Sequence, residues 1–471
     1  MKRATIVQKV WAIGVTGLFF LIGCGGITPV LPSPASTASS GPLDISVTVT
    51  PSVVGMRQGA TWNFANTVSG SSNAAVTWSI QEHSAGGAIT SAGVYTAPAT
   101  EGTYHLVATS VADPTKSAVA IVNVLKSGFT STGTLGNARL QHTATLLPGG
   151  KVLVAGGGYG PDLIDGYNVV DQAELFDPAI GSFSPAGILS RDGHTATLLL
   201  DGDVLFTGGE IGWSNLSPIV SSTADLEKAI SGLFESTGSM ALAREAHAAT
   251  LLSDGRVLVS GGIIPSGISW QGLREAEVYD PTSGTFGTVA NMNVARGGHT
   301  ATLLPNGNVL VEGGGYPTAV SSAELFDPVT GSFTPTGSMT VARSAHTATL
   351  LTNGKVLIAG GGTAELYDPS TGISTPTGNM AISRMWHTAT LLPDGTVLIA
   401  GGLNGGLTGT ETATTEIYDP TTGSFTAGAT MRQGRFSHTA TLLPDGSVLF
   451  IGGASSAGDK INVLSSAEIY N

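Results

Sequence analysis

The sequence predicts an all-β chain in which a small N-terminal β-sandwich is followed by a seven-bladed β-propeller. Three observations support this fold class. The chain has 471 residues with 66 glycines and only 11 % charged residues, a composition typical of short strands and tight turns rather than of helices or disorder. A pattern of four short strands recurs seven times after residue 127, and a repeat of this length is typical of propeller blades. The two ends of the repeating region also complement each other.

Net charge and cysteine content exclude several classes of protein. The formal net charge is −13, which disfavours nucleic acid as a partner because phosphates require a basic face. The chain has one cysteine, which excludes an intrachain disulfide, a Cys-rich zinc site and a CxxC redox motif. The fold must therefore depend on burial of an apolar core, which a chain of this length can provide.

Residues 1–23 have the features of an export signal. A positive start at Lys2 and Arg3 precedes an apolar run from Val10 to Ile22, which is short for a membrane span and typical of a signal-peptide core. The run leads into Leu21-Ile22-Gly23-Cys24, which resembles the lipobox of bacterial lipoproteins. An ordinary secretory signal that happens to contain a cysteine remains the alternative.

The lipobox resemblance implies cleavage before Cys24 and acylation of its thiol. Gly25 follows Cys24 where an Asp would signal retention, so the resemblance implies an exported protein anchored by lipid in the outer membrane or at the cell surface of a bacterium. One acyl chain binds a membrane only marginally, whereas two or more make a stable anchor. Residues 24–43 are rich in Pro, Ser, Thr and Gly, and we expect them to form a flexible tether.

Residues 44–126 show short alternating strands separated by Gly, Ser and Asn turns, as in a β-sandwich. The stretches AVTWSI, AGVYTAPA and VADPTKSA resemble bacterial Ig-like domains. The resemblance implies a sandwich whose central core aromatic is Trp78. Most such domains are spacers and some bind ligands; we favour the spacer.

Residues 127–471 carry the repeat. Seven times an Arg is followed three residues later by a His that begins a near-copy of His-Thr-Ala-Thr-Leu-Leu, and a Gly-Gly pair begins 14 residues after each His. This constant spacing predicts a rigid two-stranded hairpin in every repeat. The Arg and His positions are Arg139, His142, Arg191, His194, Arg244, His247, Arg296, His299, Arg343, His346, Arg384, His387, Arg435 and His438.

A third strand follows most Gly-Gly pairs, with a Glu, an aromatic residue and Asp-Pro, as in Ala323-Glu-Leu-Phe-Asp-Pro. A fourth strand then leads to the next Arg. Gly-Gly, the Glu and the aromatic residue together resemble the kelch motif, and the resemblance covers residues 128–471. The second repeat departs from it, because Ala224-Asp-Leu-Glu-Lys replaces the Glu-aromatic-Asp-Pro strand. The fourth-strand Trp typical of kelch repeats is usually Phe here.

The ends of the repeating region predict how the ring closes. The chain stops at Asn471, after a seventh third strand that has no fourth strand behind it. Residues 128–137 have the form of a fourth strand with nothing before it. We therefore expect residues 128–137 to pair within the last blade, which removes the open edges that a sheet otherwise exposes.

Two interpretations of the Arg and His set are possible. A metal ring or catalytic array is one. The other, which we favour, is structural: each Arg pairs with the Glu of a third strand and each His makes a fixed hydrogen bond. Catalysis requires different groups in different roles, whereas these residues answer a need that every blade shares. We accordingly assign no catalytic residue, no metal site and no cofactor.

Ligand-binding residues are expected where the repeat varies. The segments after Gly-Gly differ in length, and strand direction places them on the same face as the Arg-x-x-His turns, around the mouth of the central channel. Aromatic rings with a few carboxylates and amides suit a sugar or a peptide; local packing of the loops is the alternative. The candidate ligand-binding residues are Gln141, Asp192, Trp213, Glu245, Trp270, Tyr316, Trp386 and Phe436.

Glu312 is the one acidic residue directly before a Gly-Gly pair, where other repeats have a small or apolar residue. A buried carboxylate is costly without a partner. We expect Glu312 to pair with a nearby Arg, and a role in binding is the alternative.

The sequence favours a binding protein over an enzyme. Kelch proteins include copper-radical oxidases similar to galactose oxidase, whose cofactor requires a Cys joined to a Tyr; the only cysteine here is Cys24, which excludes that activity in the propeller. We expect a monomeric surface lipoprotein that binds a glycan or a protein. The alternatives are a carbohydrate-active hydrolase or epimerase using Asp192 and Glu245, and a structural envelope protein.

Overall fold

The structure is a computed structural model that describes residues 44–125, 128–160, 168–214, 217–266, 269–405, 409–457 and 460–471. The predicted export signal 1–23, Cys24 and the tether 24–43 lie outside the described residues. Strands before residue 126 and strands after residue 128 belong to two compact units, and each unit is described by itself. Within the described residues, no helix is long and apolar enough to cross a membrane.

The N-terminal unit contains three sheets and one short 3-10 helix, η1 (His83–Gly86). Strands pair in the orders β1 (Ser46–Thr50) with β4 (Ala65–Ser69); β2 (Val53–Arg57), β9 (Ser117–Leu125), β8 (Gly102–Ser110) and β5 (Val76–Ile80); and β3 (Thr61–Asn63), β7 (Val94–Thr96) and β6 (Ala88–Ile89). β2 and β9 are parallel, and the other pairs are antiparallel.

The core of this unit differs from the expectation for Trp78. Phe64, Tyr95 and Tyr104 are the aromatic residues buried in the apolar cluster, and the ring centroids of Phe64 and Tyr95 are 6.2 Å apart. Trp78 is only partly buried and packs against the outside of that cluster. It lies on β5, an end strand of its sheet whose residues are all exposed or half-buried, and its ring centroid is 6.4 Å from that of Phe64. The Ig-like assignment of this unit stays a prediction.

The second unit contains seven four-stranded antiparallel sheets, which are the seven predicted blades. The blades are numbered in chain order, and their strands are given from the inner strand outward. Blades 1 to 3 contain β11 (Thr143–Leu146), β12 (Val152–Ala155), β15 (Gln172–Asp177) and β16 (Ser182–Ile188); β17 (Thr195–Leu198), β18 (Val204–Thr207), β21 (Ala224–Glu227) and β22 (Phe234–Ser236); and β23 (Ala248–Leu251), β24 (Val257–Ser260), β27 (Ala276–Asp280) and β28 (Thr285–Thr288).

Blades 4 and 5 contain β29 (Thr300–Leu303), β30 (Val309–Glu312), β31 (Ala323–Asp327) and β32 (Ser332–Thr336); and β33 (Thr347–Leu350), β34 (Val356–Gly360), β35 (Thr363–Asp368) and β36 (Ile373–Pro376). Blades 6 and 7 contain β37 (Thr388–Leu391), β38 (Val397–Ala400), β41 (Thr415–Asp419) and β42 (Ser424–Ala427); and β43 (Thr439–Leu442), β44 (Val448–Ile451), β47 (Ser466–Tyr470) and β10 (Phe129–Thr134).

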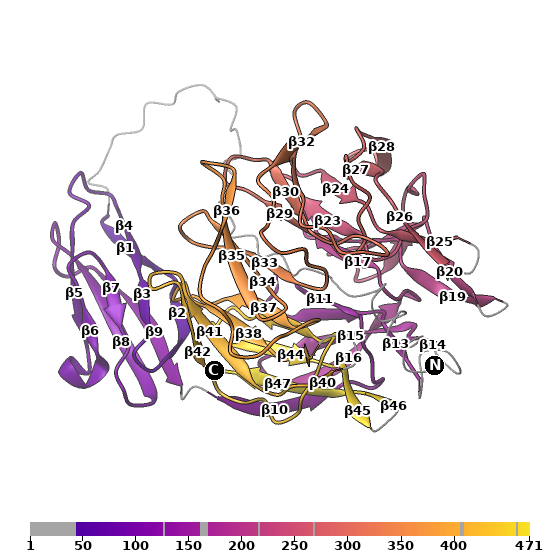
Figure 1. The fold of residues 1–471 in the computed structure, drawn as a ribbon. Helices are drawn as coiled ribbons and strands as arrows, with labels where there is room; N and C mark the ends of the chain where they lie inside the picture. Colours follow the sequence, from indigo (N-terminus) through magenta and orange to yellow (C-terminus); the bar gives the residue numbers. More distant parts are fainter. Residues whose placement is uncertain are drawn as a thin grey trace. The chain divides into compact units, whose positions relative to one another are not determined.

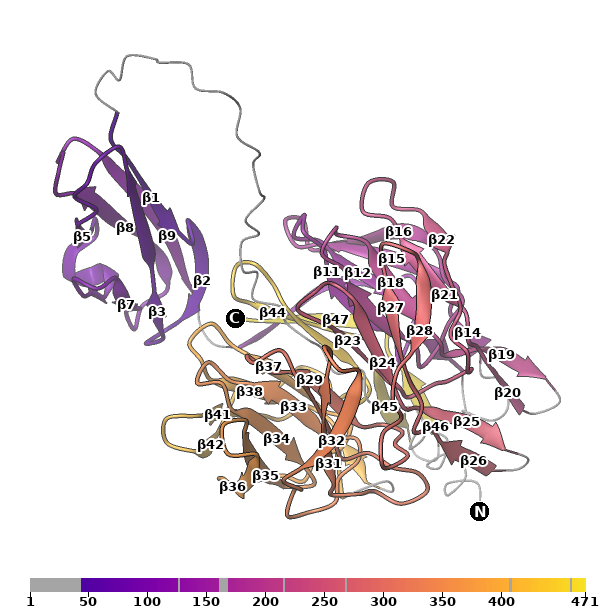
Figure 2. The same cartoon turned by 90° about the horizontal axis from the view of Figure 1, so that it is seen from above.

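The blades form a closed ring, which can be followed in Figures 1 and 2. The inner strand of each blade contacts the inner strands of both neighbours, and the series returns from β43 to β11. β10, the first strand of this unit, pairs with β47, the last strand of the chain. Phe129 lies opposite Tyr470 and Thr130 opposite Ile469, so the last blade is completed by the segment expected from the chain ends.

Apolar layers between adjacent blades make up the core. The second strand of every blade is buried along its whole length, because neighbouring blades cover both of its faces. Farther out, the third-strand aromatic residue packs against the fourth-strand Phe, with ring centroids 4.8 to 4.9 Å apart in the pairs Phe176–Phe183, Tyr279–Phe286, Phe326–Phe333 and Tyr418–Phe425. Such offset aromatic pairs add to the burial energy.

The Gly-Gly pairs allow a close approach between blades. Gly156 has φ +62, and a Cβ added to it would lie 2.5 Å from Cε1 of His194 in the next blade. Blade 5 differs, because Gly360 continues strand β34 and the left-handed pair is Gly361-Gly362. Only glycine combines a left-handed backbone with so little space.

Five of the seven segments between second and third strands form small hairpins. These are β13 (Gly158–Tyr159) with β14 (Asn168–Val169), β19 (Glu210–Ser214) with β20 (Ser217–Val220), β25 (Ile263–Ser266) with β26 (Ser269–Gly272), β39 (Leu403–Asn404) with β40 (Thr410–Glu411), and β45 (Ala454–Ala457) with β46 (Lys460–Val463). Both Figure 1 and Figure 2 show β19–β20 and β25–β26 projecting side by side.

Candidate functional site

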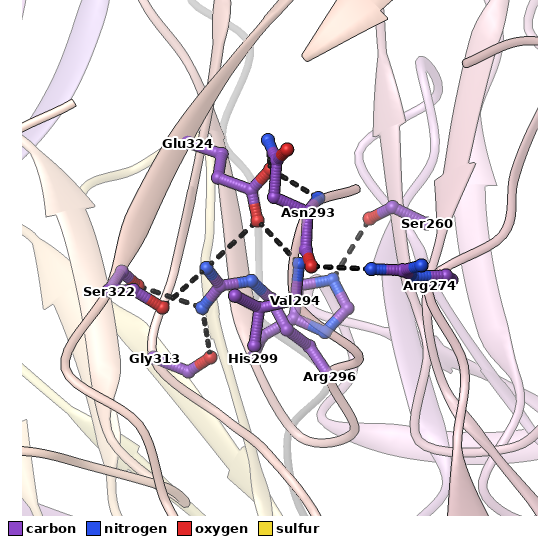
Figure 3. Close-up of polar contacts among 9 residues, drawn as sticks. All are labelled: Ser260, Arg274, Asn293, Val294, Arg296, His299, Gly313, Ser322 and Glu324. Carbon is purple, nitrogen blue, oxygen red and sulfur yellow. Dashed lines mark hydrogen bonds and ion pairs between the residues drawn. The ribbon is translucent and has the colours of Figure 1, made fainter. Parts of the chain in front are cut away.

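A buried ion pair joins the Arg-x-x-His turn to the third strand in every blade. In blade 4, Nη2 of Arg296 lies 3.1 Å from Oε1 of Glu324 (Figure 3), and both side chains are almost completely buried. Nη1 of Arg296 donates to the carbonyl oxygens of Gly313 and Ser322. The guanidinium therefore connects the turn, the end of the second strand and the start of the third.

The carboxylate of the pair also accepts hydrogen bonds from the segment that leads into the turn. Glu324 accepts hydrogen bonds from the backbone N–H groups of Asn293 and Val294, 2.7 and 3.2 Å away, on the segment that leads into the turn (Figure 3). These bonds and the nearby Arg296 lower the pKa of Glu324 although burial would raise it. Buried charges are tolerated when they are paired and fully hydrogen-bonded, and this arrangement meets that condition.

The same pairing recurs in all seven blades. The partners are Arg139–Glu174, Arg191–Asp225, Arg244–Glu277, Arg296–Glu324, Arg343–Glu365, Arg384–Glu416 and Arg435–Glu468. Blade 2 uses the shorter Asp225, whose side chain is 20 % exposed, against 5 % or less for the six glutamates. The structural pairing predicted for the arginines is thus what the structure contains.

Each histidine connects its blade to the preceding one. Its Nε2 forms a hydrogen bond of 2.9 to 3.2 Å with a hydroxyl at the start of that blade's inner strand or at the end of its second strand. The bonded pairs are His142–Thr439, His194–Thr143, His247–Thr195, His247–Thr207, His299–Ser260, His346–Thr300, His387–Thr347 and His438–Thr388. These bonds run around the whole ring, as expected for a structural role.

Burial keeps these imidazoles neutral. It lowers the pKa of all seven histidines, and the neighbouring guanidinium lowers it further, to about 3 for His194, His299, His346 and His387. A neutral imidazole in a dry environment with a fixed hydroxyl partner is a poor proton shuttle at neutral pH.

The residue directly before each histidine has a left-handed backbone. The seven residues are Gln141, Gly193, Ala246, Gly298, Ala345, Trp386 and Ser437, with φ between 49 and 61. Only two of them are glycine, so the conformation is imposed by the ring, at a cost of about 1 kcal/mol for each non-glycine residue. Several are linked across blades, since the amide of Ser437 donates to the carbonyl of Trp386, and the amide of Trp386 to that of Ala345.

The Arg-x-x-His turns and the variable segments share one face, which we call the mouth face. In blades 1, 2, 3, 6 and 7 the residue two before the His forms a bridge with the segment that follows Gly-Gly, as in Asp192 with Glu210 and Met385 with Leu403. The hairpins of blades 1, 2 and 3 contact one another in series, as do those of blades 6 and 7. Blades 4 and 5, whose segments are fully described, have no hairpin, so the rim is lowest there.

The predicted ligand-binding residues fall into three groups on this face. Trp386 and Phe436 have ring centroids 6.3 Å apart and belong to an apolar cluster with Leu140, and Trp213 packs against that cluster. Blades 1, 5, 6 and 7 supply the buried members of this cluster. The cluster therefore forms an apolar sector of the mouth.

A second apolar group lies at blades 3 and 4. Trp270 and Tyr316 pack against Ala246 and Ile263. Both rings are half-buried, so each keeps part of its surface open to solvent. Burial raises the pKa of the Tyr316 hydroxyl.

The third group is polar and lies on blades 1 to 3. With its amide nitrogen turned toward Asp192, Gln141 donates to the two carboxylate oxygens at 3.2 and 3.3 Å. Asp192, Glu245 and Glu210 are completely buried. Glu210 was not identified from the sequence; the signal that could have revealed it is a carboxylate directly after Gly208-Gly209, where other blades have Gly, Ile, Leu or Ala.

The exposure of these groups differs from the expectation of an open aromatic rim. Trp386, Phe436 and Gln141 are 4 to 7 % exposed, and Asp192 and Glu245 are not exposed at all. The physical reason is that the turn residues pack against one another and against the segments that follow Gly-Gly, as Trp386 and Phe436 do with Leu403 and Ala454. The half-buried rings of Trp213, Trp270 and Tyr316 remain accessible.

Glu312 lies at the end of β30, opposite Thr300 and beside the joint of blades 4 and 5. No Arg partner for it is found among the described residues, contrary to the expectation, because Arg296 and Arg343 already hold Glu324 and Glu365. Burial raises the pKa of Glu312 to about 8, with a further contribution from Glu365. The joint therefore holds three buried carboxyls for two guanidiniums, and Glu312 stays protonated at neutral pH.

Comparison with known proteins agrees with this architecture. The family model of the Kelch motif matches residues 387–432, which run from the inner strand of blade 6 past its fourth strand. The chain is a kelch-repeat β-propeller. The fold is similar to that of a solved structure described as a "novel fungal alcohol oxidase with catalytic diversity among the AA5 family, in complex with copper", with a TM-score of 0.58 and 18 % identity over 73 % of this chain and 76 % of that one. A search of curated proteins found no match.

The residues of this kelch propeller do not fit a copper centre of the galactose-oxidase kind. The propeller contains no cysteine for the Cys–Tyr cofactor. Its seven histidines are buried and bonded to hydroxyls of neighbouring blades. In the part of the chain that the structure describes, no three His, Cys, Asp or Glu side chains form a group able to hold a metal ion.

Proposed function

We propose that this kelch propeller is a binding protein whose mouth face takes a glycan or a protein ligand. The observation that carries the proposal is the contrast between repeated and non-repeated polar residues. The repeated Arg, Glu and His side chains form ion pairs and hydrogen bonds within and between the blades. The blade-specific residues, in contrast, lie on the mouth face in apolar and acidic groups. Aromatic rings beside carboxylates and amides suit sugars and peptides.

The accessible part of the proposed site is the rim. Trp213, Trp270 and Tyr316 are half-buried on the segments that follow Gly-Gly. A ligand can reach these rings over blades 4 and 5, where the rim has no hairpin. Trp386 and Phe436 are buried in the apolar cluster against which Trp213 packs, so we assign these two residues to shaping the site.

The test is a binding screen of residues 44–471 against glycans and envelope proteins, followed by variants of the rim. Trp270→Ala and Tyr316→Ala should each weaken binding of the identified ligand about tenfold, the effect of losing an aromatic anchor. Val329→Ala, on a turn at the other end of the strands, is the matched control. Unchanged affinity in both rim variants would remove the mouth face from the proposal.

We also propose that a lipid anchor on Cys24 holds the protein at the cell surface. Its support is the lipobox resemblance of Leu21-Ile22-Gly23-Cys24. Cys24→Ser should move the protein from the membrane fraction to the soluble exported fraction. Membrane association that is unaffected by this substitution would contradict the anchor.

A carbohydrate-active enzyme is the second candidate, favoured by the buried carboxylates Asp192, Glu210 and Glu245 at the mouth. Burial of carboxyl groups is one way in which general acids are tuned. An enzyme would turn over an identified glycan, and Asp192→Asn or Glu245→Gln would abolish that turnover while leaving binding. Binding without turnover favours the binding protein, and the absence of any ligand favours a structural envelope protein.

A further inference from the structure

Blade 2 departs from the repeat at the end of its third strand. Its third strand places Glu227 opposite Val204, where every other blade has an aromatic residue opposite the matching Val. Those aromatic residues are 0 to 3 % exposed: Phe176, Tyr279, Phe326, Tyr367, Tyr418 and Tyr470. A carboxyl group thus occupies a position that six blades use for an apolar ring.

The substitution leaves an unsatisfied acidic group. Glu227 is 6 % exposed, and its Oε2 has no hydrogen-bond partner among the described residues. Burial and the nearby Asp203 raise its pKa. In blade 3 the hydroxyl of Tyr279, at the position of Glu227, forms a 2.9 Å hydrogen bond with Thr237 of the preceding blade. Blade 1, which precedes blade 2, has Ala186 in place of that threonine and so offers Glu227 no hydroxyl at this position. An unpaired buried oxygen of this kind costs stability, which indicates that its benefit lies elsewhere.

Large apolar side chains are exposed around this carboxyl group. Ile230 is fully exposed, Leu200 is 73 %, Ile188 is 71 % and Leu233 is 61 % exposed. They lie on turns and a strand end of blades 1 and 2, and Figure 2 shows β16 next to β22. Grouped apolar exposure on a soluble protein is typical of an interaction surface.

The segments that carry these residues lie close to one another. A Cβ added to Gly202, two residues after Leu200, would lie 3.3 Å from Cβ of Ala229, the neighbour of Ile230. A Cβ on Gly187, next to Ile188, would lie 2.7 Å from the ring of Phe234, which follows Leu233. Leu200, Ile230, Leu233 and Ile188 with Glu227 and Asp203 are called the blade-2 patch below.

The blade-2 patch is rich in acidic residues. Asp203 is buried, accepts from the Ala229 amide at 2.9 Å and is ion-paired with Lys228. Glu227 adds a second buried carboxyl group, and Asp201 and Glu235 lie on exposed positions beside them. Lys228 is the one cation of the two turns, so the carboxyl groups of the patch outnumber its cations and favour a basic partner.

We propose that the blade-2 patch docks a basic, apolar segment of a partner protein, with a Lys or Arg side chain directed at Glu227 and apolar side chains on Ile230 and Leu233. A lipid surface with anionic headgroups is disfavoured by the acidic residues of the patch. A second copy of this chain is disfavoured by the net charge of −13, which makes copies repel one another. This surface is distinct from the mouth face and does not depend on the function proposed for it.

The test uses the full chain and a fluorescent peptide of alternating Lys and Leu as the probe. Saturable binding is expected, and Ile230→Ser together with Leu233→Ser should weaken it about tenfold. Val329→Ser is the matched control, since Val329 occupies the same turn position in blade 4 and is 93 % exposed. All these side chains are on the surface, so the variants should keep the melting temperature of the parent protein.

Two further measurements separate specific docking from general attraction. A Lys and Ser peptide of equal charge should not bind measurably, and Glu227→Gln should weaken the Lys and Leu peptide while leaving a melting temperature at or above that of the parent. The proposal is overturned if the parent shows no saturable binding, if the double variant binds as tightly as the parent, or if Val329→Ser weakens binding equally.

Discussion

Glu312 makes the stability of the folded propeller depend on pH. It stays protonated in the folded protein because burial raises its pKa from 4.5 to about 8, while the unfolded chain loses that proton above pH 4.5. The folded state therefore binds more protons between pH 4.5 and 8, and its stability falls there by about 1.4 kcal/mol per pH unit. Below pH 4.5 the penalty disappears.

Glu312→Gln is expected to stabilise the protein by about 3 kcal/mol at pH 7 and to have little effect at pH 4. The amide keeps the shape of the protonated carboxyl group but cannot ionise. Denaturant titration at the two pH values measures the difference, with the exposed Glu235→Gln as control. Equal stabilisation at both pH values would show that packing, and not ionisation, is responsible.

Gly156 tests the close approach between blades. Gly156→Ala introduces a Cβ 2.5 Å from the His194 ring in a left-handed backbone, so we expect a loss of more than about 2 kcal/mol. Gly149→Ala is the control, because a Cβ there meets no atom within 4 Å. Similar melting temperatures for the two variants would contradict the role assigned to Gly156.

Residue roles were predictable where repetition disclosed them. Seven copies of Arg-x-x-His and of the third-strand Glu allowed the partners to be paired from the sequence alone. Burial of Trp386 or of Asp192 was not predictable, because it depends on how blade-specific segments fold over the channel. Glu210 was missed for the same reason, and the expected Arg partner of Glu312 was wrong because the repeat had already assigned both nearby arginines.

At the scale of elements, the Arg–carboxylate pair holds each turn to its blade. Removing one partner of a fully buried pair leaves an uncompensated charge, which costs about 3 to 5 kcal/mol. Arg384→Met should lose stability in this range, since Glu416 is 5 % exposed. Arg191→Met should lose less, because Asp225 is 20 % exposed and can be hydrated.

Thermal unfolding of these two variants measures the contrast directly. We expect the larger decrease in melting temperature for Arg384→Met. A larger decrease for Arg191→Met would mean that exposure of the carboxylate does not control the strength of the joint.

The strands themselves were largely predictable, because His-Thr-Ala-Thr, the turn and the apolar second strand keep the same spacing in every repeat. The hairpins on the mouth face were not, since their sequences differ in length and composition from blade to blade. Blade 5 shows the limit of the pattern. Its second and third strands are joined directly by the two-residue turn Gly361-Gly362, so the left-handed pair lies one residue farther along the chain.

At the scale of the whole molecule, the seven neutral histidines make the ring sensitive to acid. Their pKa values are lowered in the folded state, so the unfolded chain binds more protons below pH 6.5. Stability from this source is complete above pH 6.5 and is lost progressively as the pH falls below that value. The free energy of unfolding should therefore fall steeply between pH 6.5 and 4, and a flat profile over that interval would contradict the neutral ring.

The central claim is that seven blades close into one ring through the pairing of β10 with β47. Cysteines placed at Thr130 and Ile469, which are register partners at opposite ends of the propeller sequence, test it most directly, in a chain whose Cys24 is replaced by serine. Oxidation should join them in a disulfide detected by mass spectrometry and should raise the melting temperature, because the bond closes a very long loop. A Thr130 and Ile373 cysteine pair, with Ile373 on blade 5, should stay reduced. Failure of the first pair to form, or equal formation of the second, would contradict the closed ring.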